Sequence, residues 1–235
     1  MKIFTNMKKA IENRGNGVML SKDVDIDGKT IKNFCIFKDY QEIVTLLSDR
    51  TKQHHWSEIY EPDNKCHFVL DSDITDEAGR EDPILRINSD IDTVKMRLVE
   101  YCKLQGKDIL LNDINTIILK SPSTAKKDSF HVIFKINGVL FNDILVQKNF
   151  YDYMTITKKD HFLSIDKSLY SKNHQLRTIF SSKIKFPENT LEYYGEPPKS
   201  LLDTFGSYTQ PLESDFILQK TSVKAKETKS KKRTL

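Results

Sequence analysis

Segments patterned as strands alternate along this chain with segments patterned as amphipathic helices. Apolar residues recur at helical spacing after Asp39 and within the ranges 90–105 and 142–153. Short β-rich runs lie at 67–71, 116–119, 129–136 and 175–180. Because strands and helices interleave, the sequence predicts an α/β or α+β domain with a mixed sheet.

The starts of two of these helices carry capping signals. Asp39 and Glu42 have the spacing of a capping box, with Asp in place of the usual Ser or Thr. Ser89 is placed to cap the helix over 90–105, and Gly106 is placed to end it. We therefore expect one helix to begin directly after Asp39 and another directly after Ser89.

Composition restricts the class of protein. Of the 235 residues, 10% are aromatic, which argues against a disordered chain. No apolar run approaches the roughly 20 residues that cross a bilayer, and the first residues lack the apolar stretch of a secretory signal. Three cysteines far apart in sequence exclude a disulfide scaffold and a cysteine-rich zinc site built from this chain alone. The sequence predicts an intracellular protein of the nucleus or cytoplasm with no membrane partner.

Positive charge is concentrated at the carboxyl-terminal end. The range 216–235 holds seven Lys and Arg residues against one Glu, whereas 1–215 carries a net charge of −2. We therefore expect one folded domain over 1–215 and a basic, disordered tail over 216–235. Such a tail is either a solvated extension, or an arm for nucleic acid or a nuclear address.

Two carboxylates follow a buried apolar run. Asp71 and Asp73 stand at positions i and i+2 after Phe68-Val-Leu70, so on a strand both point to the same face. Adjacent carboxylates repel unless a cation lies between them, and a divalent metal with oxygen ligands suits this position. The alternative is that Asp71 caps a turn and Asp73 is solvated.

A second motif places polar side chains on one face of a strand. Lys127, Ser129 and His131 alternate with apolar residues, so a cation, a hydroxyl and an imidazole share a face. All three can donate hydrogen bonds to phosphate oxygens. The alternative is an amphipathic strand whose polar face meets water.

A third motif begins at Asp166, which follows a short apolar stretch as Asp71 does. Arg177 and Lys183 have the same parity, so an extended chain would point both to one side. The alternative is a surface strand with scattered charge.

The three motifs together resemble those of the archaeo-eukaryotic primase superfamily, in particular its PrimPol-like branch, which includes primases of large DNA viruses. Asp71-Ser-Asp73 is similar to the hDhD motif, Ser129-Phe-His131 to SxH, and Ser164-Ile-Asp166 to hD. The segments 55–66 and 166–183 look like the matching PrimPol segments, and the resemblance covers about residues 30–185.

This resemblance implies a fold, a cofactor and roles for residues. The fold would be a primase catalytic core with an RRM-like subdomain. Two Mg²⁺ or Mn²⁺ ions would be held by Asp71, Asp73 and Asp166. The nucleotide's triphosphate would be held by Lys127, Ser129, His131, Arg177 and Lys183. Ser57 stands where relatives that prefer deoxynucleotides tend to have a bulky aromatic residue, and it would line the sugar pocket.

The function implied is that of a DNA primase or DNA-directed polymerase, which transfers nucleotides from NTPs or dNTPs to a primer on a single-stranded DNA template. A replicative helicase is a further implied partner, since viral relatives are often fused to one. Two alternatives stay open. One is a metal-dependent nuclease or template-independent nucleotidyltransferase, and the other is a non-catalytic subunit that binds nucleic acid or a helicase.

Overall fold

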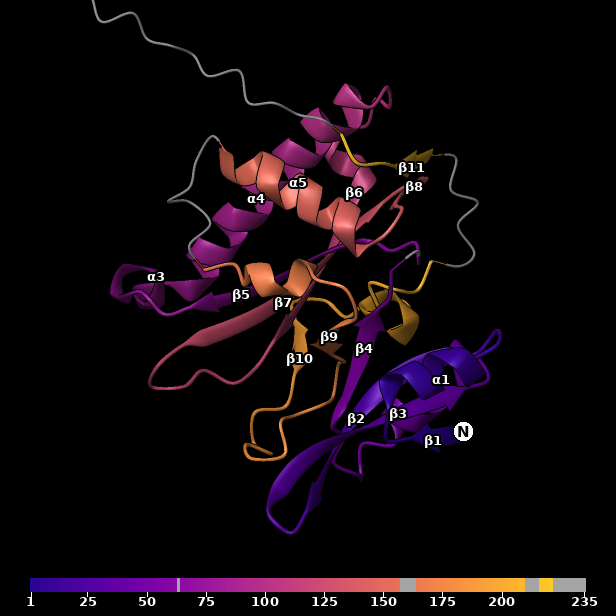
Figure 1. Ribbon diagram of the computed structural model, residues 1–235. Coiled ribbons are helices and arrows are strands. Elements are labelled where there is room, and N and C mark those ends of the chain that lie inside the picture. The colour runs from indigo at the N-terminus through magenta and orange to yellow at the C-terminus, as the bar shows by residue number, and fades with distance from the viewer. Residues whose placement is uncertain (63, 157–163, 210–215, 222–235) are drawn as a thin grey trace, which may run out of the picture.

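A computed structural model describes residues 1–62, 64–156, 164–209 and 216–221 of the chain (Figure 1). Within these ranges the chain forms two β-sheets and five α-helices. The mixed α and β class expected from the sequence is confirmed.

The first sheet is built mainly from the amino-terminal part of the chain, and all its strand pairs are antiparallel. Helix α1 (Met7–Asn13) packs on one face of this sheet through Ala10, and α2 (Tyr40–Ser48) packs on the other through Ile43 and Leu47. In spatial order its strands are β1 (Lys2–Phe4), β3 (Lys29–Phe37), β2 (Val18–Ile26), β4 (Trp56–Tyr60) and β9 (His174–Arg177).

The second sheet centres on β7 (Asp128–Ile136), which pairs antiparallel with β6 (Ile114–Lys120) and with β5 (Phe68–Ile74). The pairing of β11 with β8 is parallel, so this sheet is mixed. Its remaining strands are β10 (Glu192–Tyr194), β8 (Val139–Phe141) and β11 (Phe216–Leu218).

Helices α4 (Pro83–Leu104) and α5 (Ile144–Ile156) lie side by side over the second sheet, and α3 (Glu77–Glu81) precedes them (Figure 1). The largest apolar core lies between these helices and the sheet. Helix α4 enters it through side chains spaced three and four apart, because such residues share one helical face. These are Ile87, Ile91, Val94, Leu98 and Tyr101. Among the described residues, no helix is long and apolar enough to cross a membrane.

The caps expected from the sequence are right in two places and wrong in a third. The Asp39 carboxylate accepts from Glu42 N at 3.0 Å, as expected for the start of α2. Gly106 follows the end of α4 at a positive φ of 87°, also as expected. The start of α4 differs, because Asp82 caps it by accepting from Leu85 N at 2.9 Å. Ser89 therefore lies inside the helix, whose first turn holds Pro83.

The predicted boundary between domain and tail is also wrong at its first residues. Phe216–Leu218 form β11 instead of a tail, and the chain then follows the end of α4, where Gln219 N donates to Gln105 Oε1 at 2.8 Å. Thr221 N donates to Asn149 Oδ1 at 2.9 Å. Residues 222–235, which hold most of the expected basic tail, lie outside the described residues.

A short segment, residues 203–207, ties the two sheets together. On the first sheet, Glu58 of β4 accepts from Ser207 Oγ at 2.8 Å, Ser207 N at 3.1 Å and Gly206 N at 3.3 Å. At the second sheet, Gly206 O accepts from the N–H of His67, which directly precedes β5, at 2.8 Å. Burial raises the pKa of Glu58, and these donors offset part of that effect.

The crossing at Gly206 leaves no room for a side chain. A Cβ there would overlap Tyr60 Oη and Val69 Cγ1, one from each sheet. We predict that Gly206→Ala lowers the free energy of unfolding by about 3 kcal/mol, at the upper end for overpacked cores. Gly15→Ala is the control, because Gly15 has a φ of +58° but no atom within 4 Å of its Cβ position. That control should cost only about 1 kcal/mol of backbone strain. Urea unfolding measures both, and equal costs would contradict the predicted overlap.

Candidate functional site

The carboxyl-terminal half of β5 is hydrogen-bonded along both edges. On one side, Asp71 lies opposite His131 of β7 and Asp73 lies opposite Ser129. On the other side, Asp166 N donates to Asp71 O at 2.9 Å, and Asp73 N donates to Ser164 O at 2.8 Å. Three motifs that are far apart in sequence therefore meet side by side, two on paired strands and the third on the segment 164–166 beside β5.

All nine side chains predicted for the site line one cavity of about 260 Å³. The second sheet contributes one wall through β5 and β7, and the first sheet contributes the facing wall through β4 and β9. The nine are Ser57, Asp71, Asp73, Lys127, Ser129, His131, Asp166, Arg177 and Lys183. The structure brings them together, and the role of each stays a prediction.

Asp71 is an acid of the cavity whose pKa is raised. Its carboxyl is mostly buried, with Oδ1 3.5 Å from His131 Nε2. Burial, together with the negative charges of Asp73 and Asp166, raises the pKa of Asp71 to about 7. Near neutral pH this group therefore carries a proton for a large part of the time.

Asp73 has the opposite tendency although it lies two residues away. Burial alone would raise the pKa of Asp73, but hydrogen bonds from Lys127 and Ser129 outweigh it, and the pKa is lowered. Ser129 Oγ donates to Asp73 Oδ1 at 2.5 Å, and Lys127 Nζ donates to Oδ2. Asp73 is therefore ionised and partnered, whereas Asp71 is not fully ionised.

The third carboxylate and the imidazole complete this wall. Asp166 is exposed and accepts from Ser168 N at 2.8 Å, which caps the short 3₁₀ turn Lys167–Tyr170. His131 is buried, and burial together with the nearby Arg177 lowers the pKa of His131 to about 3. Its imidazole is therefore neutral, and it can donate one hydrogen bond to a ligand.

Arg177 and Lys183 reach the cavity by a different route from the one expected. The run 175–180 was expected to be a strand, but β9 ends at Arg177. The next residues turn, with Ser181 N donating to Thr178 O at 3.2 Å, so the parity of an extended chain does not apply. Lys183 still lines the cavity after this turn. Arg177 Nη1 donates to Asn189 O at 2.9 Å, and burial lowers the pKa of the guanidinium.

Sequence reasoning missed part of the first sheet's wall. Lys32 Nζ lies 3.2 Å from Asp23 Oδ1 and donates to Gln175 Oε1 at 2.7 Å, and Ser21 Oγ donates to the same oxygen at 2.7 Å. Ser21 and Asp23 share one face of β2 at positions i and i+2, which was a usable signal. It was not used because β2 and β3 were not predicted. The missed lining residues are Asp23, Lys32, His55, Gln175, Leu176 and Ser182.

The carboxylates are of the right kind for a hard divalent cation, because Mg²⁺ and Mn²⁺ prefer oxygen ligands. Burial raises the pKa of Asp71 most, and the repulsion from Asp73 and Asp166 that adds to it would be relieved by a cation. In the part of the chain that the structure describes, however, no three His, Cys, Asp or Glu side chains are gathered to hold one ion. Lys127 occupies an oxygen of Asp73, and Asp166 caps a turn. A metal ion at Asp73 would lie beside the Lys127 ammonium, and the repulsion between the two cations favours movement of Lys127 away from Asp73.

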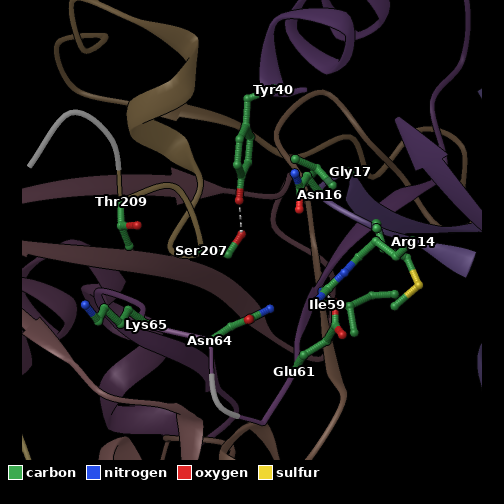
Figure 2. A pocket seen from close by; sticks show the side chains of 13 residues that line it. Arg14, Asn16, Gly17, Tyr40, Ile59, Glu61, Asn64, Lys65, Ser207 and Thr209 are labelled. Atoms are coloured by element: carbon green, nitrogen blue, oxygen red, sulfur yellow. Dashed lines mark hydrogen bonds and ion pairs between the residues drawn. The ribbon is translucent and has the colours of Figure 1, made fainter. Parts of the chain in front are cut away.

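A larger cavity, of about 440 Å³, lies elsewhere on the first sheet and contains none of the motif residues (Figure 2). Arg14 forms an ion pair with Glu61 on its wall, and Tyr40 Oη lies 3.0 Å from Ser207 Oγ. The two opposite charges neutralise each other, which leaves Lys65 as the other charged group among the described residues of the lining. The carboxylate cavity is therefore the better candidate despite its smaller volume.

Comparison of the chain with models of protein families and with curated proteins found no match. The functional assignment therefore rests on the residues that line the carboxylate cavity.

The raised pKa of Asp71 predicts a pH-dependent stability. Between about pH 4 and pH 7 the folded protein binds more protons at Asp71 than the unfolded chain does, so the free energy of unfolding falls as pH rises. Asp71→Asn removes this titration. We expect the variant to gain about 2–4 kcal/mol over the wild type between pH 4 and pH 8 in EDTA. Urea unfolding across this range measures the difference, and parallel profiles for the two proteins would contradict it.

Proposed function

We propose that this protein is the catalytic domain of a DNA primase or primase-polymerase, with a primase core and an RRM-like subdomain. It transfers nucleotides from NTPs or dNTPs to a primer on a single-stranded DNA template. One observation carries the proposal: three carboxylates and a set of phosphate donors, drawn from three motifs, line the same cavity.

The donors suit a nucleoside triphosphate. Arg177 offers a planar fork to phosphate oxygens, whereas Lys127 and Lys183 act as point charges. Ser129 and the neutral His131 add hydrogen bonds without further charge. Three cations and three carboxylates from the motifs, with Lys32 and Asp23 as a further pair in the lining, favour a ligand that brings its own negative charge together with metal ions.

The divalent ions would be held by Asp71, Asp73 and Asp166. When bound, two such ions neutralise a leaving pyrophosphate and activate a primer hydroxyl. Binding of the triphosphate gives Lys127 a new partner, so Lys127 leaves Asp73 and frees a carboxylate oxygen. The chain itself then supplies position and charge, which are its main means of raising the rate of phosphoryl transfer.

Two of the three rival functions fit these observations less well. A nuclease needs carboxylates but has no use for a triphosphate pocket of Lys, Ser, His and Arg. A non-catalytic subunit has no use for Asp71, whose burial beside two other acids raises the pKa of its carboxyl. A template-independent nucleotidyltransferase shares the whole site, and dependence on a template separates it from a primase. A replicative helicase stays a proposed partner.

The carboxylates give the first test of this function. We predict that Asp71→Ala combined with Asp73→Ala abolishes incorporation of a labelled nucleotide on a primed template with Mg²⁺ or Mn²⁺, while the fold is kept. The fold is kept because like charges are removed. The control replaces Asp92 and Asp108, which are exposed and outside the cavity, and it should retain activity. Incorporation by the folded Asp71/Asp73 variant would refute the metal assignment.

Ser57 gives a test of sugar choice. It lies on β4 opposite Arg177, and its side chain lines the cavity. In Ser57→Tyr the ring should crowd a 2′-hydroxyl and lower kcat/KM for ATP by about 10–100-fold, with little change for dATP. Ser48→Tyr, at the exposed end of α2, serves as the control. Single-nucleotide incorporation measures the ATP/dATP ratio, and an unchanged ratio would remove Ser57 from the sugar pocket.

A further inference from the structure

The turn after β9 contains a strained residue. Phe180 has a φ of +62°, in the left-handed region that bulky side chains rarely adopt. It stands third in the turn Thr178–Ser181, a position where positive φ favours Gly or Asn. Strain of this kind persists only where the surroundings enforce it, and it is concentrated at functional sites.

Neighbouring residues hold Phe180 by a hydrogen bond to its backbone and by contacts with its ring. Phe180 N donates to Leu191 O at 2.7 Å. The guanidinium carbon of Arg50 stacks 3.6 Å from the centre of the ring, and the ring of Tyr193 meets it edge-on at 5.7 Å. Arg50 is itself held by Glu192, with Nη2 2.7 Å from Oε1. The ring thus fills a place that a glycine would leave empty.

One arm of the turn is attached to the first residue of β4, and the other arm to the segment that leads into β4. Before the turn, Thr178 N donates to Trp56 O at 3.0 Å. After it, Ser182 N donates to His54 O at 2.8 Å. Arg177 directly precedes the first arm, and Lys183 directly follows the second. The geometry of the turn therefore fixes the separation of the backbone positions from which these two cations reach the cavity.

We propose that Phe180 and Arg50 are positioning residues, which hold Arg177 and Lys183 at the spacing that a triphosphate requires. The inference rests on the proposed function, and it identifies the residues that set the geometry of the phosphate site before a ligand binds. Neither Phe180 nor Arg50 lines the cavity, so both act through the turn. Without the stacked ring the turn relaxes, and the two cations no longer meet one ligand together.

Calorimetric binding of inorganic tripolyphosphate tests the positioning without relying on polymerase activity. We expect Phe180→Gly to bind tripolyphosphate about tenfold more weakly, because small displacements of positioned groups are costly. Its stability should not fall in parallel, because glycine relieves the positive φ. In primed incorporation the KM for ATP should rise while kcat stays nearly constant.

Matched variants separate positioning from folding and from charge. Phe180→Tyr keeps the ring and should restore binding. Arg50→Lys keeps the charge but loses the planar stack, and it should weaken binding as Phe180→Gly does. Arg50 is exposed, so this variant tests the inference even if Phe180→Gly does not fold. Asp27→Gly relieves a positive φ outside the cavity and should leave the affinity for tripolyphosphate unchanged.

The outcomes separate the inference from the proposed function. If folded Phe180→Gly or Arg50→Lys binds tripolyphosphate with the affinity of the wild type, the inference is overturned. If the wild type binds tripolyphosphate and the variants do not, but the wild type incorporates no nucleotide, the inference stands and the proposed function fails. If the wild type does not bind tripolyphosphate at all, both fail.

Discussion

The double pairing of β5 is the constraint on which the rest of the structure depends. Its carboxyl-terminal half is bonded to β7 on one side and to residues 164–166 on the other, so Asp71 cannot change register without breaking both ladders. A slip by one residue would turn Asp71 and Asp73 to the opposite face, because side chains alternate along a strand. Phe68 anchors the register from that opposite face, where it packs against Phe134, Phe141, Phe150 and Tyr170.

The two sheets bring complementary charges to the cavity. The second sheet carries Asp71 and Asp73, and the first carries Arg177, whose positive charge lowers the pKa of Asp71 against the larger effect of burial. The attraction between Arg177 and Asp71 acts between the two walls, whereas the repulsion between Asp71 and Asp73 acts within one wall. The segment 203–207 also joins the walls, through Glu58 and Gly206, by hydrogen bonds that involve none of these charges. The site can therefore lose a charge without losing the contact between the sheets.

The sequence predicted the second sheet better than the first, for physical reasons. Runs such as 67–71 and 129–136 are buried on the core side, so their apolar pattern is strong. The hairpin of β2 and β3 is largely exposed toward its tip, where Val24 and Ile26 alternate with aspartates before the turn at Gly28, and this hairpin signal was not used. The motif residues were therefore found, whereas the wall of Asp23, Lys32 and Gln175 was not. The turn at Phe180 also escaped prediction, because a phenylalanine gives no signal for a positive φ. The start of α4 was placed late because Asp82-Pro83 was not recognised as its cap.

The place of β9 in the first sheet has a consequence for how the molecule forms. β9 pairs with β4, yet the whole helical layer and the centre of the second sheet lie between them in sequence. Closing so long a loop is entropically costly, and contacts between distant residues form slowly. During synthesis of the chain, the edge of β4 that pairs with β9 stays unpaired until Arg177 has left the ribosome. The amino-terminal sheet is thus completed late, and until then its open edge is a surface on which nascent chains can associate.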